Sequence, residues 1–241
     1  MRINKWLARM GVASRRKIDE LIEEGKILVN DEPAELGMDV DPQKDRVEVD
    51  GEVVAIEDKP ELEYWKLYKP PGVVSTVSDP EGRKTVLDLL KDSKDAERLF
   101  PVGRLDIESE GLLLMTNDGA LTQKLTHPKY EVPKEYLAWI NGRLTGTALS
   151  RLSRGVKLID GKTAPAEIKV IFREQDRSKL SITITEGRNH QIRRMIAKVG
   201  ATVVRLKRTK LGTLELGKMK EGEVKRLTQE EVAGLNQLVE L

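Results

Sequence analysis

A run of strict alternation between apolar and polar side chains most constrains the fold of this chain. From Leu180 to Thr185 every second residue is Leu or Ile, and the residues between them are Ser or Thr. A period of two predicts a strand with one buried and one solvent-facing side. From Ile192 to Val199 the apolar residues recur at helical spacing, and Gly200 ends that segment before an apolar run from Ala201 to Leu206. The sequence therefore predicts a strand, a helix and a second strand in succession.

The rest of the chain repeats strand signals more often than helix signals, without regular alternation between the two. Further extended segments are predicted at residues 26–30, 62–68, 73–77, 111–116, 135–140 and 166–172. Further helices are predicted at residues 3–10, 15–24, 85–90, 120–126 and 144–154. This pattern predicts an α+β protein whose larger domain is built around a mostly antiparallel sheet.

The composition excludes several kinds of chemistry. The chain has no cysteine and only two histidines, His127 and His190. Without cysteine there is no disulfide framework, no thiolate metal site and no thiol nucleophile, and two histidines are too few for most metal centres. No apolar run approaches the roughly 18 residues of a membrane-spanning helix, and no segment resembles a signal peptide. We therefore expect a cytoplasmic protein without metal, cofactor or membrane partner.

Basic residues are concentrated in two segments that contain no acidic residue. The formal net charge is only +2, but six basic residues fall between Met1 and Ile18. The second segment, Gly187 to Lys210, contains Arg188, Arg193, Arg194, Lys198, Arg205, Lys207, Arg208 and Lys210. A single basic run is most simply a solvated helix face. Two acid-free clusters in a chain with 40 acidic residues indicate contact with a polyanion instead.

The first basic cluster belongs to a helix, helix, strand unit. Its second helix has Ser14 as the predicted N-cap and arginines in its first turn, where free backbone N–H groups also favour phosphate. Residues 11–30 (GVASRRK…LIEEGKILVN) resemble the small RNA-binding domain named after a ribosomal small-subunit protein. One departure is Asp31, where that family has Gly. The resemblance implies an RNA-binding domain over residues 1–60, with the RNA-binding candidates Arg2, Arg9, Arg15, Arg16 and Lys17.

Two stretches in the larger segment, residues 61–241, bring together charges of opposite sign. An apolar run ending in PVGRLD delivers the carboxylate of Asp106 to the predicted end of a strand. In EGRNHQIRR, Gly187 is predicted to open the amphipathic helix that carries the arginines. With few other groups able to do chemistry in this chain, we interpret Asp106 as a nucleophile or a base. The charged, Pro-containing segment 57–61 is the predicted linker between the two domains.

Four motifs of the larger segment, in this order, resemble the pseudouridine synthases, in particular the RsuA/RluB branch that modifies ribosomal RNA. They are KPPGVVST at residues 69–76, GRLD with SEGLLL at 103–114, KEY at 134–136 and EGRNHQIRR at 186–194. The resemblance implies the pseudouridine synthase fold and a cofactor-free isomerisation of uridine. It implies that Asp106 attacks the ribose or removes its 2′ proton, and the sequence does not separate these routes.

The same resemblance assigns two further catalytic residues. Arg193 matches the arginine that pairs with the catalytic Asp, and Tyr136 matches the tyrosine that stacks on the target base and helps with the proton leaving carbon five. Ring stacking contributes on the order of 1–3 kcal/mol per base. His190 is interpreted as an orienting hydrogen-bond partner, since the adjacent arginines disfavour an imidazolium. The RNA-binding candidates of this domain are Arg104, Arg188, Arg194, Lys207 and Arg208.

The hypothesis is therefore that a monomer flips and isomerises one uridine in a stem-loop of ribosomal RNA, within the RNA alone or in a ribosome assembly intermediate. The overall similarity favours 23S, large-subunit RNA, although the small-subunit, 16S enzymes share every motif. Two alternatives remain open. One is a non-catalytic RNA-binding assembly factor, and the other is a nucleoside hydrolase, which would release free uracil.

Overall fold

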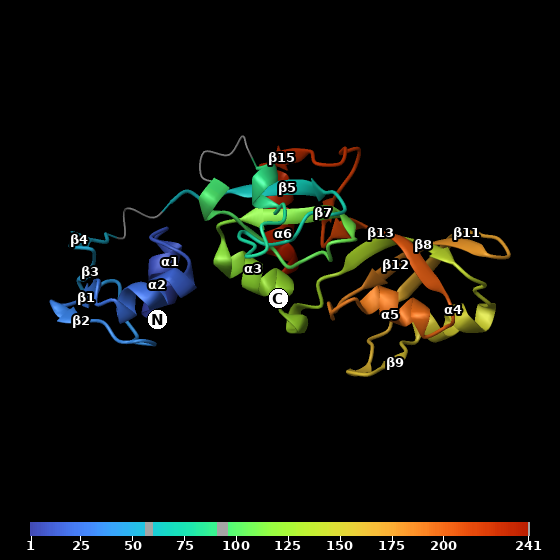
Figure 1. Ribbon diagram of the computed structural model, residues 1–241, viewed down its shortest axis with the longest axis horizontal. Coiled ribbons are helices and arrows are strands. Elements are labelled where there is room, and N and C mark those ends of the chain that lie inside the picture. Colours follow the sequence, from blue (N-terminus) through green and yellow to red (C-terminus); the bar gives the residue numbers. More distant parts are fainter. Residues whose placement is uncertain (56–59, 91–95, 241) are drawn as a thin grey trace. The chain divides into compact units, whose positions relative to one another are not determined.

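The computed structural model describes residues 1–55, 60–90 and 96–240, without the side chain of Glu97 (Figure 1). These residues form two compact units, the first made of Met1–Glu63 with Asn117–Gly119, and the second of Tyr64–Thr116 with Ala120–Leu241. Glu57 to Lys59 of the predicted linker lie outside the described residues, so a domain boundary at residue 60 stays a prediction. No described helix is long and apolar enough to cross a membrane.

The first unit begins with two helices, α1 (Ile3–Arg9) and α2 (Arg15–Glu23). Ser14 is the N-cap of α2, and its Oγ accepts a hydrogen bond of 3.2 Å from the Lys17 backbone N–H. Apolar residues of both helices pack with those of the following strands, including fully buried Ile3 and Ile18. The predicted pair of helices is confirmed, and its basic residues lie on the exposed side.

A four-stranded sheet in the order β2-β1-β3-β4 completes this unit. Its strands are β1 (Ile27–Val29), β2 (Glu32–Pro33), β3 (Val47–Val49) and β4 (Glu52–Val53). Asn30 and Asp31 both have positive φ, 53° and 69°, in the two-residue turn between β1 and β2. Such a hairpin turn requires positive φ at both positions, and Asn and Asp tolerate it. Asp31 therefore fits a turn where the family has Gly.

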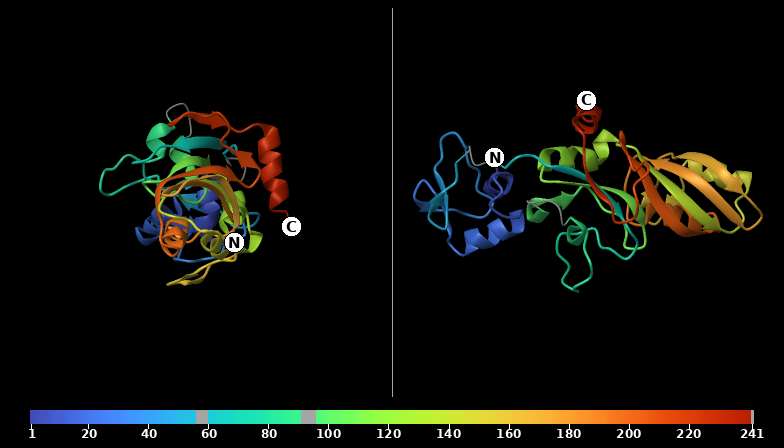
Figure 2. Two further views of the ribbon diagram at one scale, coloured as in Figure 1. Left: turned by 90° about the vertical axis from the view of Figure 1, so that its right-hand side faces the viewer. Right: turned by 90° about the horizontal axis from the view of Figure 1, so that it is seen from above.

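The second unit is built on a nine-stranded sheet in the order β11-β12-β8-β13-β7-β5-β15, with β14 beside β13 and β6 beside β7. The strands are β5 (Tyr64–Lys69), β6 (Phe100–Pro101), β7 (Glu110–Thr116), β8 (Lys134–Asn141), β11 (Glu167–Arg173), β12 (Arg177–Ile184), β13 (Thr202–Leu211), β14 (Leu214–Glu215) and β15 (Val224–Arg226). The two ends of the sheet run in different directions, so the sheet is twisted (Figure 1 and Figure 2). Among the described strands only β7 and β13 pair in parallel, which confirms the predicted mostly antiparallel α+β class.

Helices and short turns cover this sheet. The helices are α3 (Gly119–Thr126), α4 (Gly146–Ser153), α5 (Gln191–Ala197) and α6 (Gln229–Leu238), and the 3₁₀ turns are η2 (Leu87–Leu89), η3 (Ala96–Arg98) and η4 (Pro128–Tyr130). Apolar residues of α4 and α5 pack against β8, β12 and β13, and those of α3 and α6 form a second cluster with β7 and β13. A small separate hairpin joins β9 (Lys157–Leu158) to β10 (Gly161–Lys162).

β7 is an interior strand of the sheet, between β13 and β5, and every one of its residues is buried. Leu112 and Leu114 pack into the cluster with α3 and α6, whereas Leu113 and Met115 pack into the cluster under η2. A strand buried on both faces reads as a continuous apolar run rather than an alternating one. The run GLLLM therefore fits the position that β7 takes in the sheet.

The structure differs from the sequence-based prediction at four points. Residues 73–77 do not form the predicted strand and contribute only an isolated β-bridge between Val74 and Thr85. The helix predicted at 85–90 is instead the short 3₁₀ turn η2. Asp106 lies in the loop between β6 and β7 rather than at the end of a strand. Gly187 does not open α5, because Gly187 to Asn189 form a loop and His190 is the N-cap, with φ of 48°.

The close approach of β7 and β13 generates a prediction. Gly111 has φ of 107°, and a Cβ there would lie 2.2 Å from the Arg208 carbonyl oxygen. Replacing Gly111 with Ala should lower the free energy of unfolding by about 3 kcal/mol, through strained φ and overpacking. Gly146→Ala in α4 is the control, because its Cβ would meet nothing within 4 Å. Urea unfolding of both variants is the measurement, and equal midpoints would contradict the prediction.

Candidate active site

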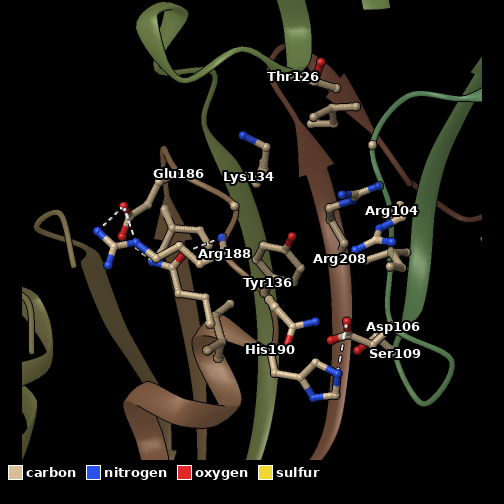
Figure 3. A pocket seen from close by; sticks show the side chains of 18 of the residues that line it. Arg104, Asp106, Ser109, Thr126, Lys134, Tyr136, Glu186, Arg188, His190 and Arg208 are labelled. Carbon is tan, nitrogen blue, oxygen red and sulfur yellow. Dashed lines mark hydrogen bonds and ion pairs between the residues drawn. The ribbon is translucent and has the colours of Figure 1, made fainter. Parts of the chain in front are cut away.

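A pocket of about 290 Å³ opens where the Asp106 loop faces β8, β13 and the turn before α5 (Figure 3). Most of its polar lining comes from four separate segments. These contribute Arg104, Asp106 and Ser109 from the loop, Lys134 and Tyr136 from β8, Glu186, Arg188 and His190 from the turn, and Arg208 from β13. Sheet pairing explains part of this convergence, because Tyr136 lies opposite Arg208 on β13 and opposite Ile182 on β12. The strand order thus brings together residues far apart in the sequence.

The Asp106 carboxylate is partly exposed at the wall of the pocket. Its Oδ1 atom lies 3.6 Å from His190 Nε2, and the side chain keeps 29% of its exposure. His190 is the N-cap of α5 and has a left-handed backbone conformation. Its side chain faces the Asp106 carboxylate (Figure 3). The sequence indicated a hydrogen-bonding role for His190 without naming its partner, and in the structure that side chain faces the Asp106 carboxylate.

The loop that carries Asp106 is held by the KPPGVVS segment. Lys69 is fully buried, and its Nζ donates hydrogen bonds to the carbonyl oxygens of Pro70 at 3.0 Å, Ile107 at 3.4 Å and Ser109 at 2.7 Å. Burial lowers the pKa of Lys69 to about 8, so near pH 7 most of it remains an ammonium group with three donors.

Ser75 holds the same loop from the other side of Asp106. Its Oγ donates to the Leu105 carbonyl oxygen at 2.9 Å and accepts from the Leu105 N–H at 3.1 Å. Gly72 N–H also donates to the Ile107 carbonyl oxygen at 2.8 Å. The residues immediately before and after Asp106 are therefore tied to one segment. Sequence reasoning included these residues in a motif but gave them no role.

Two buried polar atoms of the pocket lining have no hydrogen-bond partner in the described structure. They are Nη2 of Arg208, whose residue is 2% exposed, and Oγ of Ser109, which is 1% exposed. Arg208 Nε donates to the Leu112 carbonyl oxygen at 2.7 Å, which fixes the guanidinium. Because buried polar groups are normally satisfied, unpaired groups lining a pocket indicate a polar ligand.

Tyr136 and Lys134 project from β8 into the same space (Figure 3). Tyr136 is 8% exposed, so its ring has a fixed environment. Lys134 Nζ donates to the Val132 carbonyl oxygen at 2.9 Å. Burial, together with the neighbouring Arg208 charge, lowers the pKa of Lys134 to about 8. Lys134 was not singled out from the sequence, although it begins the KEY motif.

Arg193 is not part of the pocket lining. Its Nη2 lies 3.7 Å from Glu108 Oε2, and its Nη1 donates to the Val203 carbonyl oxygen at 3.2 Å. The expected ion pair with Asp106 is thus replaced by one with Glu108, two residues further along the loop. The reason is that α5 directs Arg193 towards Val203 on β13 and towards Glu108, whereas His190, just before α5, faces the Asp106 carboxylate.

Arg188 and Arg194 are engaged by the β9–β10 hairpin. Arg188 donates to the carbonyl oxygens of Asp160, Gly161 and Lys162, and also contacts Glu186 at 3.0 Å. Arg194 forms a bidentate pair with the Asp160 carboxylate at 3.0 and 2.9 Å, which lowers the pKa of Asp160. These contacts fix both guanidinium groups to the protein.

The remaining RNA-binding candidates lie in different surroundings. Arg104 is exposed at the pocket. Lys207 is not part of the pocket lining, and its Nζ lies 4.5 Å from the centre of the Tyr68 ring. Arg9, Arg15, Arg16 and Lys17 are exposed on the first unit, where Arg15 bonds Asn4 and Lys17 pairs with Glu20. Arg2 lies 3.6 Å from Asp39. Within the described residues no group of three or more His, Asp or Glu side chains could hold a metal ion.

Comparison with known proteins gives a matching family for each part of the chain. The family described as RNA pseudouridylate synthase matches residues 63–198, and the S4 domain matches residues 1–47. The ribosomal large subunit pseudouridine synthase B of Bacillus subtilis is 43% identical over 99% of this chain and 97% of its own length. The protein of that name from Shigella flexneri is 39% identical over 100% of this chain and 84% of its own length.

A solved structure supports the fold over the whole chain. A crystal structure of a pseudouridylate synthase aligns with a TM-score of 0.71 and 29% sequence identity, covering 98% of this chain and 99% of that one. Since the matched family spans more than half of the chain and the curated relatives align along nearly all of it, this chain belongs to the RNA pseudouridylate synthases and carries an S4 domain before its synthase domain.

Proposed function

We propose that this enzyme converts one uridine of large-subunit, 23S ribosomal RNA to pseudouridine, and that the pocket around Asp106 performs the reaction. The observation that carries the proposal is the convergence of Asp106, Tyr136 and Arg208 from three separate elements on one pocket. The substrate class is supported by the two relatives named ribosomal large subunit pseudouridine synthase B. The reaction breaks the bond between the ribose and N1 of uracil, turns the detached base and rejoins it through carbon five.

Asp106 supplies the carboxylate for bond cleavage. It acts as an anion, either attacking carbon one of the ribose or removing the 2′ proton, and both routes need it ionised and close to the sugar. His190 Nε2, 3.6 Å from Oδ1, orients the carboxylate, and the hydrogen bonds from Lys69 and Ser75 fix its loop. Arg193 is a positioning residue, since its pair with Glu108 holds the same loop from the side of α5.

Tyr136 and the unpaired polar atoms hold the flipped base. The Tyr136 ring stacks on uracil, and its hydroxyl is available for the proton that leaves carbon five. Ser109 Oγ and Arg208 Nη2 provide hydrogen-bonding groups for the uracil carbonyl oxygens or for the phosphate of the flipped nucleotide. Arg104 and Lys134 add positive charge for that phosphate. Binding removes the cost of leaving these buried groups unpaired.

The S4 unit binds the folded RNA around the target through Arg9, Arg16 and the neighbouring cations. Sequence-specific recognition favours splayed bases, so the substrate is a uridine in a stem-loop, free or within a ribosome assembly intermediate. We assign the RNA-binding domain to residues 1–60 and the catalytic domain to residues 61–241. The protein works as a cytoplasmic monomer in ribosome biogenesis.

The role of Asp106 is tested with transcripts whose uracils carry tritium at carbon five. The wild type should release tritium into water from the large-subunit transcript, and Asp106→Asn should lower the rate by at least about 10³-fold, because the amide is neither a nucleophile nor a base. Unchanged thermal unfolding and RNA affinity of the variant serve as controls. Release of free uracil would identify a hydrolase, release from the small-subunit transcript alone would reassign the substrate, and salt-sensitive binding without any release would favour an assembly factor.

The lowered pKa of Lys134 gives a pH-dependent prediction. At pH 7 the ammonium form predominates, and as the pH rises through about 8 the free protein loses this charge from its pocket. The dissociation constant for RNA should therefore increase between pH 7 and pH 9, by up to about tenfold for the loss of one phosphate contact. Lys134→Gln should bind more weakly at pH 7 and lack this increase. Parallel pH curves for the two proteins, measured by fluorescence anisotropy, would contradict the prediction.

A further inference from the structure

The turn that carries His190 towards Asp106 is held in a strained conformation. Residues 185–190 join β12 to α5 without regular structure. At the end of the turn, His190 has φ of 48°, and as the N-cap of α5 it makes no side-chain hydrogen bond to the helix. A side chain in the left-handed region persists only where neighbouring contacts enforce it. The contacts of this turn therefore decide whether His190 faces the Asp106 carboxylate.

Gln191, the first residue of α5, closes the turn from the inside. The residue is only 4% exposed. Its Oε1 atom accepts a hydrogen bond of 3.0 Å from the Arg188 backbone N–H, and its own backbone N–H donates to the Arg188 carbonyl oxygen at 3.2 Å. The first backbone N–H groups of a helix have no partner within the helix, so the second bond also satisfies the start of α5. Residues 188–191 are thereby closed into a hydrogen-bonded ring.

Glu186, at the other end of the turn, binds the same glutamine. Its Oε1 atom accepts from Gln191 Nε2 at 2.6 Å and from the Ala164 backbone N–H at 3.0 Å. Its Oε2 atom accepts from Arg188 Nε at 3.0 Å (Figure 3). An ionised carboxylate only accepts hydrogen bonds, and all of these partners are donors. The amide of Gln191 is therefore fixed, with its oxygen towards Arg188 and its nitrogen towards Glu186.

We propose that Glu186 and Gln191 are positioning residues of the synthase, whose hydrogen bond holds the turn in the conformation in which His190 faces Asp106. Both side chains line the pocket, but their polar atoms are already bound to protein groups, so they act on the reaction through His190. A glutamine suits this position because its amide accepts from one neighbour and donates to the other. The proposal rests on the proposed function, because it gives the turn a role in the chemistry at Asp106.

The hydrogen bond is tested with Gln191→Glu, which keeps the shape of the side chain and replaces its donor with a second carboxyl group. The Arg188 guanidinium pairs with Glu186 and keeps it ionised, so the introduced group must be protonated to donate to it. The neighbouring carboxylate raises the pKa of the introduced group, which donates at low pH and loses its proton as the pH rises. Relative to the wild type at the same pH, single-turnover tritium release at saturating RNA should be similar at about pH 6 and about tenfold slower at about pH 8.

Two further variants separate this effect from a general loss of structure. Gln191→Met has a similar length but neither donor nor acceptor, and should slow release about tenfold at both pH values. Gln229→Glu is the matched control, because Gln229 is also the first residue of a helix, α6, but is exposed. It should keep the wild-type rate at both pH values. Thermal unfolding shows whether each variant is folded at the assay temperature, and RNA affinity should stay at the wild-type value.

The position of His190 is measured separately from activity. The chain has two histidines, so His127→Gln leaves the imidazole proton signals of His190 alone in the NMR spectrum. In this background, Gln191→Glu should match its parent at about pH 6. At about pH 8 its His190 signals should move to where Asp106→Asn places them, because both changes remove the contact with the carboxylate.

The outcomes separate the positioning role from the chemistry. If the wild type releases tritium but Gln191→Glu keeps the wild-type rate and the parent's His190 signals at the higher pH, the inference is wrong and the proposed function stands. An equal loss of rate at both pH values with unmoved His190 signals would also overturn the inference. If the wild type releases no tritium, the proposed function fails, and the His190 signals alone decide whether Glu186 and Gln191 hold the turn.

Discussion

The hydrogen bonds from Lys69 and Ser75 to the Asp106 loop are the constraint on which the site depends. The loop has no regular structure, yet it must hold a carboxylate at one position in a pocket formed by other elements. Lys69 at the end of β5 and Ser75 a few residues later bind backbone groups on both sides of Asp106. Because Lys69 is fully buried, its ammonium group gives up solvation for these three carbonyl oxygens. The Lys-Pro-Pro-Gly segment therefore positions the Asp106 carboxylate indirectly, through hydrogen bonds to the backbone of its loop.

The cations around the site are of two kinds, those that already pair with other groups of the protein and those that line the pocket. Arg188 and Arg194 hold the β9–β10 hairpin, and Arg193 holds Glu108, so these guanidinium groups shape the protein. Arg208 lines the pocket and has one buried nitrogen without a partner in the described structure, and Lys134, in the same lining, has a lowered pKa. A basic segment in the sequence thus contains both structural and ligand-directed charges. Only their partners in the folded chain distinguish the two kinds.

The sequence was a good guide wherever periodicity or a capping residue determines local structure. It predicted the strand over 180–185, the buried strand over 111–116 and the cap at Ser14, and all three are present. It did not predict the β9–β10 hairpin, β15 or α6, which are short or lack a strong apolar period. The contact of His190 with Asp106 also escaped prediction. It depends on a left-handed residue at the start of α5 and on how α5 packs, which are tertiary properties.

The most direct test of the account is the rate of tritium release by Ser75→Ala, measured at saturating RNA together with its RNA affinity. Removing Oγ leaves the Leu105 N–H and carbonyl oxygen without this partner and frees the loop at Asp106. The account predicts a rate about 10- to 100-fold lower, with unchanged affinity, since small misplacements of a catalytic group are costly. Ser178→Ala, which removes a buried hydroxyl that has no partner in the described structure, should keep the wild-type rate. Equal rates for the two variants would contradict the view that the loop hydrogen bonds position the carboxylate.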